Sequence, residues 1–179
     1  MWTGKLKYAI ALGALVLLSA CVSAEHPPAA AEKPLTAWWL KTRFEPTGQS
    51  VAGVPISRLD HTWAAANELT REALASAVSS TDLQQLSDTP LTLSLRADLD
   101  GNGEPERYLV GVYRTTTGDT GRFLAVVADP ASKPRILVDP GMPAFSALLV
   151  DGKTIHWYKC LQCGEYEVVR WSKGRLVLE

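Results

Sequence analysis

The chain has few of the side chains that most often carry enzyme chemistry. Its 179 residues include only three cysteines and three histidines. None of the histidines lies near a nucleophile motif such as Gly-x-Ser-x-Gly, and the sequence has no glycine-rich loop of the kind that holds phosphates. These absences argue against an enzyme, so we expect a structural or binding role.

The sequence also has no large excess of either charge. Lysine and arginine together number 18, aspartate and glutamate number 19, and the formal net charge is −1. The basic residues are not clustered, whereas a nucleic-acid-binding surface needs a basic patch or stripe. We therefore expect no nucleic-acid partner.

The apolar run near the start of the chain is too short to span a bilayer. Residues 8–18 read YAIALGALVLL, well below the about 20 residues that a transmembrane helix needs. Lys5 and Lys7 precede this run and small residues come after it, which is the order found in a secretory signal peptide. We predict that residues 1–20 are such a signal and that the protein is exported.

The run ends in Leu18-Ser19-Ala20-Cys21. These residues resemble the lipobox of bacterial lipoproteins, in which Leu, two small residues and Cys follow the apolar core. The resemblance implies that the Cys21 thiol receives a diacylglyceryl group, that cleavage leaves Cys21 as the N-terminus, and that its amine can carry a further acyl chain such as palmitate. The alternative is an ordinary secretory signal with a chance cysteine at its end.

The residues after Cys21 bear on location. Lipoprotein families typically carry Asp after the lipidated cysteine when the protein is retained in the inner membrane, and this chain has Val22 there. The resemblance thus implies the outer membrane of the cell envelope, facing the periplasm. Residues 21–34, rich in Ala, Pro and Glu, are predicted to form the lipidated end and a flexible tether. The membrane is then one partner, and an envelope protein is a candidate second.

Residues 35–179 are long enough for one domain with its own core. Asp60 is a suitable N-cap for a helix, and the Ala-rich segment HTWAAANELTREALASAV after it repeats apolar residues at intervals of three and four. Residues 91–96, directly after Pro90, alternate with period two as in a half-buried strand, and further β-like runs follow, separated by turn residues. We predict an α+β fold with one amphipathic helix followed by an antiparallel β meander. The predicted strands cover residues 91–96, 107–114, 122–128, 135–138, 146–150, 154–159, 166–171 and 176–178.

The segment DLDGNGEPE at residues 98–106 has the composition of a calcium loop. Oxygen-bearing side chains occupy positions one, three, five and nine, and glycines occupy positions four and six. Ca²⁺ prefers about six to eight oxygen ligands, and alternate positions of a tightly curled loop converge on one point. A plain polar turn is the alternative, because Asp, Asn and Gly favour turns without a metal.

This loop is not an EF-hand, because its twelfth residue is Leu109 instead of a bidentate glutamate. It resembles the calcium loops of integrin-type FG-GAP and VCBS repeats, where an acidic nine-residue loop joins two strands. The family usually ends this loop with Asp, whereas Glu106 stands here. The resemblance implies side-chain ligands at Asp98, Asp100, Asn102 and Glu106, and a backbone carbonyl ligand at Glu104.

Cys160 and Cys163 form an even pair once Cys21 carries lipid. A pair in an oxidising compartment commonly forms a disulfide. A zinc site needs four ligands, and His156 is the one further candidate nearby. A redox centre usually lies at a helix N-terminus, whereas both flanks of this pair are β-like. A structural disulfide is favoured over a thiol-disulfide centre or a metal site.

These features predict a lipid-anchored envelope lipoprotein with a non-enzymatic role in interaction or structure. Two alternatives come from other classes. One is a calcium-binding β module that mediates binding, and the other is a periplasmic thiol-disulfide protein that uses Cys160 and Cys163.

Replacing Cys21 with serine tests the anchor. Serine cannot form the thioether to diacylglycerol, so we expect the Cys21→Ser variant to move from the membrane to the soluble periplasmic fraction. Envelope fractionation and mass spectrometry of the purified chain measure this, and Cys163→Ser is the matched control that should remain on the membrane. A Cys21→Ser chain that still pellets with membranes would contradict the prediction.

Overall fold

The computed structural model describes residues 37–127 and 134–179. All described elements belong to one compact unit, Leu35–Glu179. The predicted signal peptide, Cys21 and the tether lie outside the described residues. None of the helices within the described residues has the length and apolar character that a membrane span requires.

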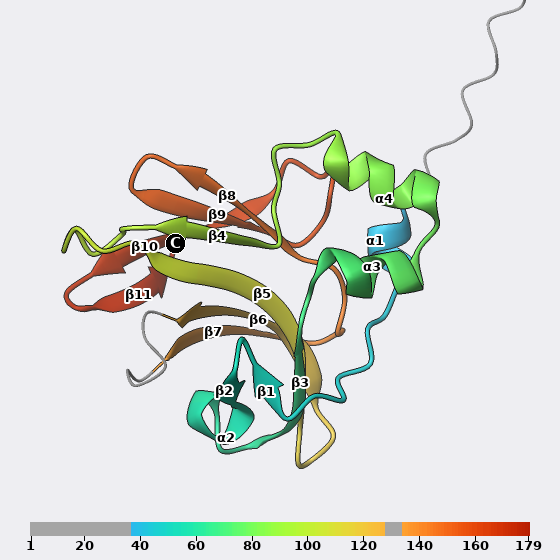
Figure 1. Cartoon of the computed structure of the whole chain (residues 1–179), viewed down its shortest axis with the longest axis horizontal. Coiled ribbons are helices and arrows are strands. Elements are labelled where there is room, and N and C mark those ends of the chain that lie inside the picture. Colours follow the sequence, from blue (N-terminus) through green and yellow to red (C-terminus); the bar gives the residue numbers. More distant parts are fainter. Residues whose placement is uncertain (1–36, 128–133) are drawn as a thin grey trace, which may run out of the picture. The chain divides into compact units, whose positions relative to one another are not determined.

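Four short helices and eleven strands make up the described part of the chain (Figure 1). The helices are α1 (Trp38–Lys41), α2 (Ile56–Leu59), α3 (Arg71–Ala77) and α4 (Ser80–Ser87). The strands are β1 (Ser50–Val51), β2 (Val54–Pro55), β3 (Trp63–Glu68), β4 (Ser94–Ala97), β5 (Glu106–Thr115), β6 (Thr120–Val127), β7 (Arg135–Pro140), β8 (Ala147–Asp151), β9 (Thr154–Tyr158), β10 (Tyr166–Ser172) and β11 (Arg175–Leu178).

The strands form three antiparallel sheets. β1 and β2 make a small hairpin, β11-β10-β9-β8 make a four-stranded sheet, and β3-β5-β6-β7 make a larger sheet in which β4 also pairs with β5. β3 and β4 lie one after the other along one edge of β5, because β3 pairs with residues 111–115 and β4 with residues 106–109. α3 and α4 form the excursion between these two strands.

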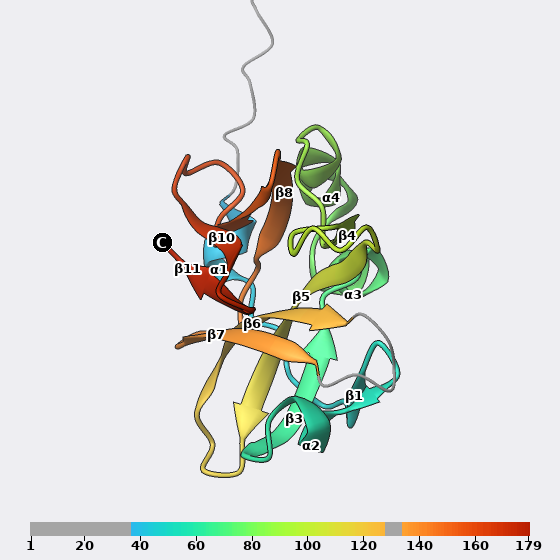
Figure 2. The same cartoon turned by 90° about the vertical axis from the view of Figure 1, so that its left-hand side faces the viewer.

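Alternate residues of β5 face two different cores. Tyr108, Val110 and Val112 join the core shared with the four-stranded sheet, whereas Leu109 and Tyr113 join the core shared with β1, β2 and α2. Figure 2 shows the resulting layers, with the β5 sheet between the four-stranded sheet and the β1–β2 region. β5 is therefore buried on both faces over residues 108–113, and these central residues are apolar whereas both ends of the strand are polar.

The predicted α+β fold, with one helix and a single meander, is wrong. Trp63–Glu68 is strand β3, and the helix α3 begins only at Arg71, where the Thr70 side chain accepts the Ala73 N–H. Alanine favours helices locally, but pairing with β5 and burial of Trp63 outweigh that preference. The meander likewise divides, because β4 to β7 and β8 to β11 belong to different sheets.

The predicted cap at Asp60 serves a turn instead of a long helix. Its carboxylate accepts the Thr62 N–H at 2.8 Å and the Thr62 hydroxyl at 2.7 Å. This Asx-type turn leads the chain directly into β3. Asp60 thus organises a local turn, and the hydrogen bonds between β3 and β5 determine the structure of the next residues.

Gly111 occupies a point of β5 where no side chain fits. A Cβ there would lie 2.2 Å from Cζ of Phe123 and 2.4 Å from the backbone oxygen of Asn67. The Phe123 ring is itself fully buried, so it has no free space to move into. The close approach of β3, β5 and β6 therefore depends on glycine at this position.

We expect Gly111→Ala to lower the free energy of unfolding by roughly 1–3 kcal/mol, because an added methyl group overpacks the sheet. Urea unfolding of the purified chain measures the change. Arg96→Ala, an exposed change on the neighbouring strand, is the control and should shift the stability by less than about 0.5 kcal/mol. Equal midpoints for Gly111→Ala and wild type would contradict the steric argument.

Candidate metal site

The predicted calcium loop joins β4 to β5. β4 ends at Ala97 and β5 begins at Glu106, so the strand–loop–strand context is the one that the sequence indicated. Gly101 and Gly103 have φ values of 76° and 89°. Only glycine adopts this left-handed region without strain, and these two residues let the loop curl back on itself.

Asp98 organises the curl through its carboxylate. Oδ1 accepts the N–H of Gly101 at 2.8 Å and of Asn102 at 3.1 Å, and Oδ2 accepts the N–H of Gly103 at 2.9 Å. Hydrogen bonds to a charged acceptor are stronger than neutral ones. The first residue of the loop thus fixes the backbone of the residues after it.

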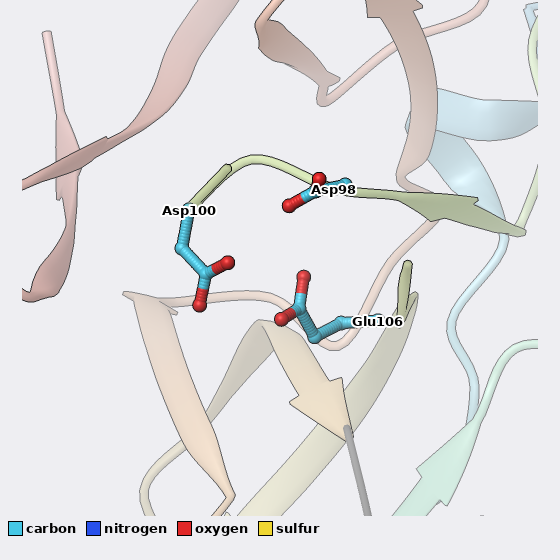
Figure 3. A group of neighbouring side chains, drawn as sticks. All are labelled: Asp98, Asp100 and Glu106. Carbon is cyan, nitrogen blue, oxygen red and sulfur yellow. The ribbon is translucent and has the colours of Figure 1, made fainter. Parts of the chain in front are cut away.

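Three carboxylates converge inside this loop. Asp98, Asp100 and Glu106 each place one oxygen within 4.8 Å of the others, and Figure 3 shows the three groups directed toward a common point. Two oxygens on opposite sides of a calcium ion lie about 4.6–5.2 Å apart, given Ca–O distances of about 2.3–2.6 Å. The spacing of the three oxygens therefore fits one Ca²⁺ ion.

Glu106 is the buried member of this group. Its residue is 5% exposed, whereas Asp98 and Asp100 are partly exposed. The Tyr108 hydroxyl lies 3.4 Å from Oε2 of Glu106. Burial, reinforced by the Glu106 carboxylate, raises the pKa of Tyr108, so this phenol stays protonated and able to donate.

The other two predicted ligands, Asn102 and Glu104, take part in hydrogen bonds within the loop. The Asn102 amide donates to Oδ2 of Asp100 at 3.2 Å, and its oxygen accepts the Glu104 N–H at 2.7 Å. Asn102 thus orients Asp100, and Glu104 is exposed. The structure brings the carboxylates of Asp98, Asp100 and Glu106 together, and it links Asn102 to Asp100 through a hydrogen bond.

The donor set is chemically suited to a hard cation. Carboxylate oxygens are preferred ligands of Ca²⁺, and each carboxylate offers about four lone-pair sites. The hydrogen bonds within the loop use only some of these sites, which leaves acceptor capacity on Asp98, Asp100 and Glu106.

Sequence reasoning missed the surroundings of the loop. Tyr108 could have been found, because residues i and i+2 of a strand share a face and Glu106 begins β5. Asp60 and Arg135 line the same pocket as Asp100 and Glu106, of about 730 Å³, but they come from distant segments. No local signal connects those segments to the loop.

Cys160 and Cys163 lie in the loop between β9 and β10. Their Cα atoms are 5.8 Å apart, which is within the range of a disulfide. Cys160 is buried and Cys163 is exposed. Both neighbouring elements are strands, so the arrangement supports a structural disulfide. His156, the further candidate for a zinc ligand, stacks on Tyr166 with ring centroids 4.0 Å apart.

Comparison with known proteins identifies no relative of this chain. Searches against protein-family models, curated proteins and solved structures each found no match to this chain. Function is therefore inferred from the residues and from their geometry.

We expect Asp98→Ala to destabilise the domain by about 1–3 kcal/mol without divalent cations, because the N–H groups of Gly101 and Gly103 lose their acceptor and that of Asn102 keeps only Asp100. Asp98→Asn keeps one acceptor oxygen and should lose less. Urea unfolding in EDTA measures both variants, with Asp151→Asn at the exposed end of β8 as the control. If Asp98→Ala unfolds at the wild-type urea concentration, the carboxylate does not organise this loop.

Proposed function

We propose that this chain is a non-enzymatic, lipid-anchored protein of the bacterial cell envelope whose β domain binds Ca²⁺ at the Asp98–Glu106 loop. The lipobox-like residues 18–21 support the anchor. The burial of Glu106 against two further carboxylates is the observation that carries the calcium site.

The electrostatics of the loop favour a bound cation. Two unit charges about 4 Å apart repel by about 1 kcal/mol in bulk water and by several times more near a low-dielectric interior. Glu106 lies on the interior side of the group, and burying a charge is costly unless a counter-charge or hydrogen bonds compensate. The ion pairs within residues 37–127 and 134–179 involve other carboxylates. Arg135 lines the same pocket as Asp100 and Glu106, and a divalent cation held between the three carboxylates would add counter-charge at their centre.

A structural role for the ion is consistent with the position of its ligands. Asp98 and Asp100 come from the loop, and Glu106 is the first residue of the buried strand β5. An ion held by all three would tie the loop to the central strand. The stabilised β domain would then act in binding or scaffolding at the membrane, with a protein of the envelope as its partner.

Calcium titration of the purified chain tests this proposal. Extracellular modules bind Ca²⁺ with Kd of about 10⁻⁴–10⁻³ M, so we expect heat of binding at millimolar Ca²⁺. At tenfold Kd the linkage relation gives about 1.4 kcal/mol of stabilisation, which corresponds to a rise in Tm of a few degrees for a domain of this size.

Matched variants separate this site from general salt effects. Glu106→Gln and Asp100→Asn each remove a charged ligand and should abolish both the heat and the rise in Tm, whereas Asp151→Asn should keep them. A wild-type chain that shows neither signal at millimolar Ca²⁺ would remove the calcium site and leave a plain polar turn.

A further inference from the structure

The surface around α1 gathers exposed apolar and basic side chains. Leu40, Met142 and Tyr166 are 56%, 54% and 45% exposed, and they line one pocket. Lys41 and Arg43 are exposed beside Leu40. We call these five residues the α1 patch. It contains three of the six large hydrophobic residues that are exposed within the described residues.

Packing beneath the α1 patch holds it in place. Trp38 and Trp39 are buried, and the Trp38 ring meets Phe145 edge to face with centroids 5.1 Å apart. With these two residues facing inward, Leu40 is left on the outer side of α1. The Arg43 guanidinium donates to the Leu40 carbonyl at 2.9 Å and contacts Sδ of Met142 at 2.6 Å, which joins two distant segments.

The pocket that these side chains line has a volume of about 440 Å³, and Arg122, Lys159 and Glu167 of its lining take part in ion pairs. Arg122 and Lys159 lie 2.9 Å and 3.3 Å from Oδ2 of Asp139, and Lys159 lies 3.1 Å from Glu167. Burial lowers the pKa of Lys159, while its two acidic neighbours act in the opposite direction. These charges compensate internally, so the apolar wall and the outer basic residues decide what the patch binds.

The charge at the rim of the α1 patch is basic. Lys41 and Arg43 take part in none of the ion pairs formed within the described residues, and Glu165 is the exposed acid that lines the same pocket. Apolar side chains flanked by Lys and Arg suit an anionic lipid surface. The apolar side chains enter the interface, and the basic side chains contact the anionic headgroups.

The proposed lipid on Cys21 places this patch within reach of the bilayer. α1 is the first described element after Cys21, and it begins at Trp38. At about 3.3–3.6 Å per residue, the intervening chain spans at most roughly 60 Å. A surface tethered at this range meets the leaflet at high effective concentration, so a weak affinity of the patch for lipid is sufficient for docking.

We propose that the α1 patch docks on the phospholipid leaflet that holds the anchor, with Leu40, Met142 and Tyr166 entering the interface and Lys41 and Arg43 contacting anionic headgroups. This inference rests on the proposed lipid anchor. The anchor fixes the chain to the membrane, and the patch fixes how the β domain faces it.

Photocrosslinking in vesicles tests the orientation. The lipidated full chain is placed in vesicles of phosphatidylethanolamine and phosphatidylglycerol that contain a phospholipid with a diazirine in its acyl chain, and adducts are mapped by mass spectrometry. We expect adducts to concentrate in residues 38–43, 141–144 and 165–167. The double variant Leu40→Glu with Met142→Glu should reduce them about fivefold, because charge opposes insertion at the interface.

The control is a double variant of two exposed apolar residues outside the patch, Val150→Glu with Leu178→Glu. It should keep the wild-type adduct pattern, and circular dichroism checks that both double variants remain folded. Vesicle-bound chain with adducts spread evenly, or with none in the folded domain, would overturn docking and leave the anchor intact. Wild-type chain that fails to pellet with vesicles would overturn the anchor, and docking with it. If crosslinking in intact envelopes joins the α1 patch to a protein, and the patch forms no lipid adducts in vesicles, the patch binds a protein partner and the lipid docking is overturned.

Discussion

The pairing of strand β5 is the constraint on which the rest of this structure depends. β3 and β4 occupy one of its edges, β6 occupies the other, and separate cores cover its two faces. The central residues 108–113 of this strand have no solvated side, so their neighbours must match them closely in shape. Gly111 shows how closely, since the backbone of β3 and the Phe123 ring of β6 fill the space where a Cβ would stand.

The same strand links the core to the candidate metal site. β5 begins with Glu106, whose carboxylate is buried among the acids of the loop, and Tyr108 lies two residues further along. A cation held at this end would act directly on the element that organises the domain. This is why a structural role suits the site better than a catalytic one.

The two proposed functional surfaces lie far apart. Figure 1 shows the loop between β4 and β5 at one end of the described domain and α1 at the opposite end. If the α1 patch rests on the lipid leaflet, the calcium loop faces away from the membrane. The end of the domain that carries the loop would then be the one accessible to an envelope partner.

The sequence by itself determined the features that depend on neighbouring residues. The β-like runs after residue 96, separated by turn residues, predicted β5 through β11 to within a few residues. The order of Asp, Asn and Gly in residues 98–106 predicted the curled loop, since turn residues act through short-range hydrogen bonds and left-handed glycines.

Only the tertiary structure decided the features that depend on distant partners. Trp63–Glu68 reads as part of a helix, and pairing with β5 makes it a strand. The division of the meander into two sheets, the burial of Glu106 and the assembly of the α1 patch from α1, Met142 and Tyr166 likewise come from contacts between remote segments. Local propensities amount to tenths of a kcal/mol per residue, whereas burial of a large side chain contributes about 1.5–3 kcal/mol, so tertiary packing prevails where the two disagree.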